Sequence, residues 1–237
     1  MSTPELSVVL PCYNESRGLE AILRRFQEVC GDQDFELILV DNGSTDDTPA
    51  VLQELLPAFP FARSIRVDPN QGYGHGIYSG LKAATGNILA WSHADLQTDP
   101  EDVFKGLRLL SDAPNPTRTF VKGRRYGRQL SEKIVSVGMQ VIATCLLRTR
   151  MHEINAQPKI FHRDLLDVIS EPPIDFNFDV YVLYQAQKHG YKVTDFPVQF
   201  PPREYGESNW ANTWRSKIRT ILRSMRYMMH LGLGGNA

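Results

Sequence analysis

The chain has 237 residues, of which 42% are hydrophobic and 22% are charged, and its formal net charge at pH 7 is −1. This length and composition allow one large domain or two small ones with a sizeable core, and they exclude a mainly disordered chain. No window reaches the roughly 20 apolar residues of a membrane span and no basic leader precedes an apolar region, so we expect a protein that is neither secreted nor transmembrane.

Apolar, β-branched runs alternate with helical patterns along the chain. Strands are predicted at 6–11, 35–41, 63–68, 87–92 and 119–123, and helices near 16–30, 45–56, 74–84 and 100–110. The alternation predicts an α/β fold with a mostly parallel sheet and helices on both faces. Ligands of such sheets bind at the carboxyl ends of the strands.

Polar motifs follow the first four predicted strands, at 11–15 (PCYNE), 41–44 (DNGS), 68–76 (DPNQGYGHG) and 93–97 (HADLQ). Four loops therefore face one cleft. Gly72, Gly74 and Gly76 let the backbone approach a ligand closely and can present N–H groups to a phosphate, although glycine also serves any tight turn.

Two aspartates in these loops have a local explanation. The stretch from Ser44 to Asp47 fits a capping box, and Asp99-Pro100 fits a helix N-cap followed by a first-turn proline. We therefore expect Asp47 and Asp99 to stabilise helices, and we leave them out of the site.

Asp95 follows the apolar run 88–91, where an acidic side chain needs a partner or a function. With His93 and Gln97 it supplies an imidazole and side-chain oxygens within five residues. Such a set suits a divalent cation that keeps positions open for substrate phosphates. The alternative for His93 is a histidine hydrogen-bonded at a strand end.

Charge is unevenly distributed along the sequence. Basic and acidic residues number 8 and 17 in 1–117, 8 and 1 in 118–150, 4 and 7 in 151–200, and 6 and 2 in 201–237. A solvated helix face explains any single basic run. Two basic segments in an acidic protein also suit an anionic partner, but we expect no nucleic acid.

The last segment has an amphipathic helical pattern. Trp214, Ile218, Ile221, Met225 and Met228 form an apolar stripe, and a basic stripe lies beside it, formed by Arg215, Arg219, Arg223 and Arg226. Such a helix can lie on an anionic membrane, or its apolar stripe can pack on the domain or on an oligomer partner.

In chain order, the motifs PCYNE (11–15), VDNGSTD (40–46), NQGYGHG (70–76), HADLQTDP (93–100), VKGRRYG (121–127) and FPPREYGESNW (200–210) resemble those of the inverting family 2 glycosyltransferases. The resemblance is strongest to the dolichyl- or polyprenyl-phosphate mannose (or glucose) synthase branch and covers about residues 5–215. It implies the GT-A fold, with a catalytic domain at 1–209 and the amphipathic basic helix and tail at 210–237. The donor-binding half would be 1–117 and the acceptor-binding half 118–209.

The resemblance also implies a nucleotide-sugar donor, a lipid-phosphate acceptor and a divalent cation, Mg²⁺ or Mn²⁺. The residues that it places at the donor are Pro11, Tyr13, Glu15, Asp41, Asn42, Gly72, Gly74, His93 and Asp95. The metal would be bound by Asp95, Gln97 and His93. The acceptor phosphate would be met by Arg125, with Arg128 or Lys133. Arg203 would stabilise the charge of the reacting phosphates.

Three positions depart from this branch. His93 replaces an aspartate, so the histidine either ligates the metal, favouring Mn²⁺ over Mg²⁺, or hydrogen-bonds the diphosphate. Asn42 also replaces an aspartate, and because an amide donates as well as accepts, it can change which base is read. Asn209 replaces a lysine, which removes a positive charge near the reacting phosphates.

A phosphate acceptor is already ionised at neutral pH and needs no general base. If the acceptor is instead a hydroxyl, the candidate base is Asp179, which otherwise caps or hydrogen-bonds a helix predicted at 177–189. A non-catalytic nucleotide-sugar-binding or scaffold subunit is the alternative of another class, because the metal motif keeps one carboxylate.

The cellular setting follows from the cysteines and from the implied acceptor. Cys12, Cys30 and Cys145 match neither a disulfide framework nor a zinc site, so we expect them to be structural or incidental in a reducing cytosol. We expect a cytoplasmic protein, peripheral on the inner face of a membrane through its C-terminal helix. It would act alone, as a homo-oligomer or with a membrane-anchored partner.

Overall fold

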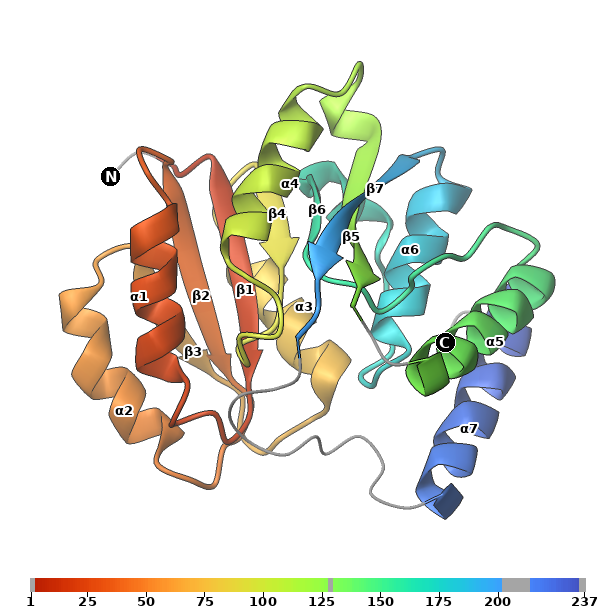
Figure 1. The fold of residues 1–237 in the computed structure, drawn as a ribbon, viewed down its shortest axis with the longest axis horizontal. Helices are drawn as coiled ribbons and strands as arrows, with labels where there is room; N and C mark the ends of the chain where they lie inside the picture. The colour runs from red at the N-terminus through yellow and green to blue at the C-terminus, as the bar shows by residue number, and fades with distance from the viewer. Residues whose placement is uncertain (1–2, 128–129, 202–213, 235–237) are drawn as a thin grey trace.

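The computed structural model describes residues 3–127, 130–201 and 214–234, without the side chains of 130–135 and 214–217. At its centre is one seven-stranded sheet in the order β3-β2-β1-β4-β6-β5-β7 (Figure 1). The strands are β1 (Leu6–Cys12), β2 (Phe35–Asp41), β3 (Ala62–Arg66), β4 (Ile88–Trp91), β5 (Thr119–Tyr126), β6 (Lys159–His162) and β7 (Lys192–Gln199).

Most neighbouring strands in this sheet are parallel. β6 runs antiparallel to both β4 and β5, and the remaining pairs are parallel. The mostly parallel sheet predicted from the sequence is confirmed, whereas β6 and β7 were not predicted. Because β6 lies between β4 and β5, the sheet is continuous across the two halves expected at 1–117 and 118–209.

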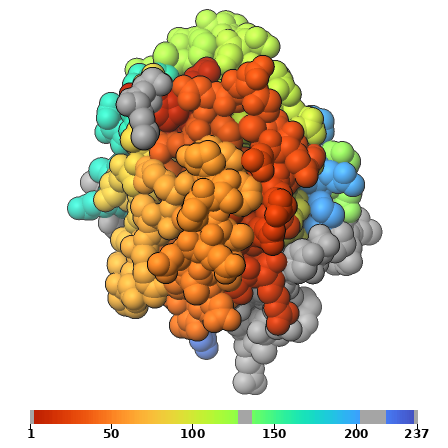
Figure 2. All heavy atoms as spheres, turned by 90° about the vertical axis from the view of Figure 1, so that its left-hand side faces the viewer, coloured from red at the N-terminus to blue at the C-terminus, as the bar shows by residue number. Residues whose placement is uncertain are grey.

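Helices cover both faces of the sheet, as the alternating pattern predicts. One face carries α1 (Leu19–Val29), α2 (Thr48–Leu55) and α4 (Glu101–Ser111), and the other carries α3 (Tyr73–Ala83), α5 (Leu130–Leu147), α6 (Phe178–Lys188) and α7 (Trp214–Gly232). Short 3₁₀ segments lie at Leu56–Ala58, Pro116–Arg118 and Arg163–Val168. Figure 2 shows α1 and α2, in red and orange, covering the β3 side of the molecule.

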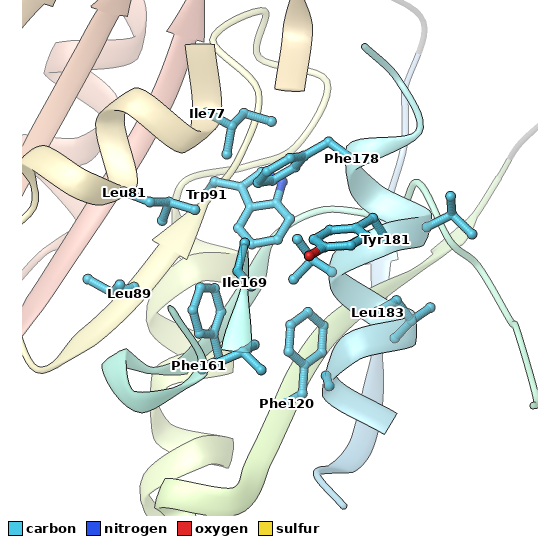
Figure 3. Packing of buried hydrophobic residues seen from close by; sticks show 14 of the residues in the cluster. Ile77, Leu81, Leu89, Trp91, Phe120, Phe161, Ile169, Phe178, Tyr181 and Leu183 are labelled. Atoms are coloured by element: carbon cyan, nitrogen blue, oxygen red, sulfur yellow. The ribbon is translucent and has the colours of Figure 1, made fainter. Parts of the chain in front are cut away.

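The central strands are mostly apolar, with exceptions such as Ser7 in β1 and Glu36 in β2, because both of their faces are buried. In β1, Val8 and Leu10 belong to the core under α1, α2 and α4, and Val9 belongs to the core under α3 and α6. The second core is aromatic, with the Trp91 ring edge-on to Phe161 and Phe178 at 5.7 and 5.6 Å between ring centroids (Figure 3). Such two-sided burial is typical of parallel sheets.

The prediction of a capping box from Ser44 to Asp47 is wrong. The helix begins at Thr48, where Asp46 Oδ1 accepts a hydrogen bond from the Thr48 amide at 3.0 Å, and Asp47 makes no side-chain cap bond. The N-cap of α4 is Pro100 rather than the predicted Asp99, but Asp99 does stabilise this helix: its Oδ1 accepts from the Glu101 amide at 2.9 Å.

The apolar stripe predicted for the C-terminal helix does not act as one surface. Met228 is buried and Met225 packs on the core beside α5, so this part of the stripe faces the domain. Ile218 is exposed, and Ile221 is half-buried. None of the helices within the described ranges is long and apolar enough to cross a bilayer.

Candidate active site

The loops after β1 and β2 form one hydrogen-bonded unit at the carboxyl edge of the sheet. The Asn14 amide donates to Ser44 Oγ at 3.0 Å, and Asn14 Oδ1 accepts from the Thr45 amide at 2.9 Å. The Glu15 amide donates to Thr48 Oγ1 at 3.0 Å. Asn14 has a φ of 58°, a left-handed conformation that asparagine tolerates better than most residues. Two of the predicted donor loops are therefore held together by their own backbone and side chains.

Asp41 is buried at the end of β2 and has an ion-pair partner that the sequence did not indicate. Its Oδ1 accepts from the Ser44 amide at 3.0 Å, and its Oδ2 pairs with Arg66 of β3 at 2.5 Å. Pro11 lies next to the end of β1, and Tyr13 is exposed in the loop that follows. A carboxylate, a guanidinium and an exposed aromatic ring thus lie where the base and ribose of the donor are expected.

Asn42 ties the end of β2 to the loop before α3. Its buried side chain donates from Nδ2 to the Gly72 carbonyl at 2.9 Å and makes a longer contact of 3.5 Å to Asn70 Oδ1. An aspartate could not donate these bonds. The asparagine that departs from the resembling branch therefore has a structural use: it holds the third donor loop.

Gly72 and Gly74 allow a close approach, but to the protein's own backbone. Gly72 has a φ of 105°, and a Cβ there would lie 2.5 Å from the Ile174 carbonyl oxygen. A Cβ on Gly74 would lie 2.7 Å from Phe178 Cβ. The glycines predicted to approach a phosphate thus pack the start of α3 against segment 173–178.

The loop after β4 places the expected metal residues beside the end of β7. Asp95 is buried, and its Oδ1 accepts from the Gln97 amide at 3.1 Å. Gln97 Nε2 donates to the Pro201 carbonyl at 3.2 Å. The His93 ring meets the Phe200 ring edge-on, with 6.5 Å between centroids. Segment 200–201 thus positions this loop.

Arg125 reaches the same place from β5. Its side chain is 12% exposed, its Nε pairs with Glu153 Oε2 at 3.0 Å, and its guanidinium lies 5.4 Å from the centroid of the Phe200 ring. Glu153 has a left-handed φ of 43°. Phe200 therefore contacts both His93 and Arg125, which the sequence assigned to donor and acceptor respectively.

A row of cross-strand neighbours, buried except for the exposed Asp195, crosses the sheet beneath these residues. Trp91, Lys159, Lys122 and Asp195 are successive register partners on β4, β6, β5 and β7. Lys122 Nζ lies 3.4 Å from the Glu153 carbonyl, and burial lowers the pKa of Lys122 to about 8, with Asp195 acting in the opposite direction. Burial also lowers the pKa of Lys159. Both lysines have a carboxylate nearby, Asp179 for Lys159 and Asp195 for Lys122.

Asp179 is buried in the first turn of α6 and forms an ion pair with Lys159. Gln157 Nε2 donates to the same Asp179 oxygen at 3.2 Å and contacts the Tyr73 hydroxyl, also at 3.2 Å. The Asp179 carboxylate is thus occupied by two donors of the protein itself. This arrangement favours the structural interpretation of Asp179 over its use as a general base.

The donor set at the end of β4 fits a divalent cation that is shared with a diphosphate. Burial lowers the pKa of His93, although the Asp95 and Asp179 carboxylates act in the opposite direction, and the neutral imidazole is the ligand form. Across 3–127, 130–201 and 214–234, no group of three or more His, Cys, Asp or Glu residues is arranged to hold a metal. The side chains do not fit a metal held by the protein alone.

Several predicted residues lie outside the described residues, namely Arg128, Arg203 and Asn209, together with the side chain of Lys133. Conversely, the sequence analysis did not identify Arg66, Lys122, Glu153, Lys159 and Phe200. Lysines within short apolar runs such as TFVKG and PKIF were the available signal, because a charge in a buried strand needs a partner.

Comparison with known proteins gives a consistent family assignment. The sequence matches the family model "Glycosyl transferase family 2" over residues 7–170. It is 27% identical over 229 residues to undecaprenyl-phosphate 4-deoxy-4-formamido-L-arabinose transferase of Sodalis glossinidius, covering 89% of this chain and 65% of that protein. It is 29% identical over 226 residues to an uncharacterized glycosyltransferase of Mycobacterium bovis, covering 94% and 97%.

Solved structures agree at the level of the fold. Glucosyl-3-phosphoglycerate synthase from Mycobacterium tuberculosis, in complex with phosphoglyceric acid, superposes with a TM-score of 0.74 at 19% identity, covering 99% of this chain and 81% of that one. The same enzyme with Mn²⁺, UDP-glucose and phosphoglyceric acid gives a TM-score of 0.72 at 18% identity, with the same coverage of both chains. With a GT-A fold and a family match over residues 7–170, this chain belongs to glycosyl transferase family 2.

Proposed function

We propose that this protein transfers a hexose from a nucleoside-diphosphate sugar to a lipid-linked phosphate of the polyprenyl or dolichyl type, with inversion at the anomeric carbon. The observation that carries this proposal is the shared contact of Phe200 with His93 and Arg125. It brings the donor loop after β4 next to a mostly buried guanidinium. A guanidinium fork suits phosphate oxygens.

Two named relatives support an acceptor that carries phosphate. The Sodalis glossinidius relative has undecaprenyl phosphate in its name, and the mycobacterial synthase binds phosphoglyceric acid. We favour the lipid phosphate, because the Sodalis glossinidius relative matches 89% of this chain and the C-terminal helix is basic.

The donor would lie across the carboxyl ends of β1, β2 and β4. Pro11, Tyr13, Glu15, Asp41 and Asn42 would surround base and ribose. Asp95 and His93, with Gln97, would hold a divalent cation, Mg²⁺ or Mn²⁺, which when bound neutralises charge on the leaving diphosphate.

Arg125 would bind and orient the acceptor phosphate, assisted by Arg128 or Lys133 and with Arg203 near the reacting phosphates. Glu153 and Phe200 hold the guanidinium in place, so little side-chain freedom is lost when the acceptor binds. The attacking oxygen is already ionised, so no side chain has to remove its proton. Charge placed in advance where the reaction needs it commonly supplies the largest catalytic contribution.

Asp179 separates this proposal from a hydroxyl acceptor. With a phosphate acceptor, Asp179→Asn causes a mild loss of rate, because the residue pairs with Lys159 and Gln157 of the protein itself. With a hydroxyl acceptor the same variant loses nearly all transfer, because the base is gone.

A transfer assay tests the proposal directly. Purified protein is incubated with UDP-, GDP- and dTDP-hexoses, Mn²⁺ or Mg²⁺, and one of three acceptors: a short-chain polyprenyl phosphate, the matching polyprenol, or 3-phosphoglycerate. We expect transfer to the polyprenyl phosphate and a rate about 10²–10³-fold lower in Arg125→Ala. Arg124→Ala, which removes the neighbouring exposed pair with Asp195, is the control and keeps most of the rate. Transfer only to the polyprenol or to 3-phosphoglycerate would contradict the proposal.

We further propose that residues 1–209 form the catalytic unit and that 210–237 bring it to the cytoplasmic face of a membrane. The basic composition of α7 supports this placement. Association into a homo-oligomer or with a membrane-anchored partner remains a prediction.

A further inference from the structure

Most of the exposed large apolar side chains lie on three elements of the molecule. Within the described residues they include Val137 and Val141 on α5, Ile174 and Phe176 before α6, and four on or just after α7, which are Ile218, Leu222, Met229 and Leu233. We call these eight residues the apolar flank. The others of this kind in the same described ranges, Tyr13, Leu109 and Tyr126, lie on separate elements.

On α5 the exposed apolar residues occupy one helical face. Val137, Val141 and Cys145 follow each other at steps of four residues and are all exposed, the two valines at 54% and 57%. Ala143 and Leu147 are buried on the opposite face. Since the inner face already packs on the core, the outer face has no use within the described chain.

On α7 the exposed face differs from the stripe that the sequence predicted. Leu222 and Ile218 are exposed at 60% and 53%, whereas Met228 and Leu231 are buried against the domain. The helix contains five lysine and arginine residues and no acidic one, and the exposed ones that the structure describes are Arg219, Arg223 and Arg226. Its outward face therefore combines apolar and cationic groups.

The three elements lie next to one another, as Figure 1 shows for α5 and α7. At the C-terminal end of α7, a Cβ on Gly232 would lie 3.8 Å from Leu147 Cα of α5. Arg223 Nε pairs with Asp175 Oδ2 at 3.3 Å, which brings segment 174–176 to the same helix. The flank thus extends from α5 across α7 to the loop before α6.

This side of the molecule borders the candidate site at two places. Segment 173–178 packs directly on the donor loop at Gly72 and Gly74. On the other side, β5 carries Arg125 and leads into α5. The flank is therefore connected to the candidate site through segment 173–178 and through β5.

We infer that the apolar flank, with Arg219 and Arg226 beside it, is the surface on which the protein docks to an anionic bilayer. The inference rests on the proposed lipid acceptor and adds α5 and segment 174–176 to the C-terminal helix. Apolar groups of such a surface insert at the headgroup level while arginines contact anionic headgroups. A second copy of the chain fits less well, because a two-fold contact through this face would bring like charges together.

Vesicle binding by the full chain tests the surface. We expect flotation with phosphatidylglycerol-containing vesicles, little with pure phosphatidylcholine, and release at high salt. Arg219→Gln and Arg226→Gln would each lower the partition coefficient about fivefold, and Val137→Ser combined with Val141→Ser about tenfold. Leu109→Ser and Arg108→Gln on α4 are the matched controls and leave it unchanged.

A probe on Cys145 shows whether α5 itself meets the bilayer. Cys12 is buried, so Cys30→Ser leaves Cys145 as the exposed thiol of the described chain for a polarity-sensitive fluorophore. Anionic vesicles should shift its emission to the blue, and the same fluorophore at L109C, in a background that also carries C30S and C145S, should not respond. Binding without a shift at Cys145, or a shift that follows protein concentration without vesicles, would overturn the inference.

The two proposals can fail separately. Transfer to a detergent-dissolved short-chain polyprenyl phosphate needs no bilayer. If that reaction proceeds and the wild-type protein does not bind anionic vesicles, the docking surface is wrong and the proposed function stands. If neither nucleotide sugar nor acceptor is used while vesicles bind, the proposed function is wrong.

Discussion

Lys159 and Asp179 form an ion pair in the interior, between β6 and the first turn of α6. Removing one partner of such a pair leaves an uncompensated charge in a medium of low polarity. Lys159→Met should therefore lower the free energy of unfolding by about 3–5 kcal/mol, measured by urea denaturation.

Lys82→Met is the control for this change, because Lys82 is exposed on α3 and its loss should stay within about 0.5 kcal/mol. If Lys159→Met and Lys82→Met were equally stable, Asp179 would not depend on the lysine. Its assignment as a structural residue would then lose its main support.

At the residue scale, the sequence identified candidate site residues that lie within one loop, but it missed contacts between residues that are distant in sequence. His93, Asp95 and Gln97 lie within five residues and were identified together. Glu153 holds Arg125 from 28 positions away, and Phe200 contacts it across 75 positions. No local pattern marks such partners, since a charged or aromatic residue looks the same in sequence whether its partner is water or a distant side chain.

At the element scale, the start of α3 depends on close backbone packing. A Cβ on Gly74 would lie 2.7 Å from Phe178 Cβ and 2.8 Å from the Asp175 carbonyl oxygen. Gly74→Ala should lower the free energy of unfolding by about 1–3 kcal/mol through overpacking, and it should also weaken nucleotide binding. Thermal unfolding and nucleotide titration measure the two effects.

Gly138→Ala is the matched change, because nothing lies within 4 Å of a Cβ at that exposed helical position. It should raise the free energy of unfolding by about 0.5–1 kcal/mol, as expected for replacing glycine in a helix. An equal effect of both substitutions would show that the packing of α3 on segment 173–178 is not tight.

Lys122 lies in the middle of β5, where burial lowers its pKa from 10.5 to about 8. Between these values the unfolded chain keeps the proton and the folded chain gives it up. The free-energy cost of burying the charged lysine therefore falls as pH rises from 8 to 10.5. Lys122→Met should therefore stabilise the protein most at pH 7, and the gain should shrink by up to about 1.4 kcal/mol per pH unit through that window.

Urea unfolding of both proteins at several pH values checks this, with Lys188→Met on the surface of α6 as the control. A difference between Lys122→Met and wild type that stays constant from pH 7 to pH 10 would rule out the lowered pKa of Lys122.

The elements themselves were predictable where burial leaves a repeated pattern. β1 and β2 are mostly apolar runs because both faces are covered, and α3 and α4 keep a helical period. β6 has four residues, KIFH, two of them polar, and is too short to show a period. β7, KVTDFPVQ, carries a proline and half of its side chains are polar or charged, and it lies at the edge of the sheet, where proline is tolerated.

At the scale of the whole molecule, the order of the strands explains how the two substrates would meet. β4 ends close to Asp95 in sequence. In the sheet it lies between β1 and β6, and β5, the next strand in sequence, is not its neighbour. β6 links β4 to β5, so the donor loop and Arg125 come to the same edge although 30 residues separate Asp95 from Arg125. A reading of alternating strands and helices predicts the layers, but it does not predict this insertion, because pairing between strands is set by contacts distant in sequence.

The most direct test of the account is a thermal-shift measurement with UDP, GDP, ADP, CDP and dTDP, each with and without Mn²⁺ or Mg²⁺. A ligand that binds only the folded state raises the free energy of unfolding, by about 2.7 kcal/mol at a hundred times its Kd, and therefore raises the melting temperature. We predict a shift with at least one nucleoside diphosphate that requires the cation, is lost in Asp95→Asn and persists in Asp99→Asn. The strand ends would not form the diphosphate site described above in either of two cases. None of these ligands raises the melting temperature of the wild-type protein in the presence of either metal, or the melting temperature of Asp95→Asn rises as much as that of wild type.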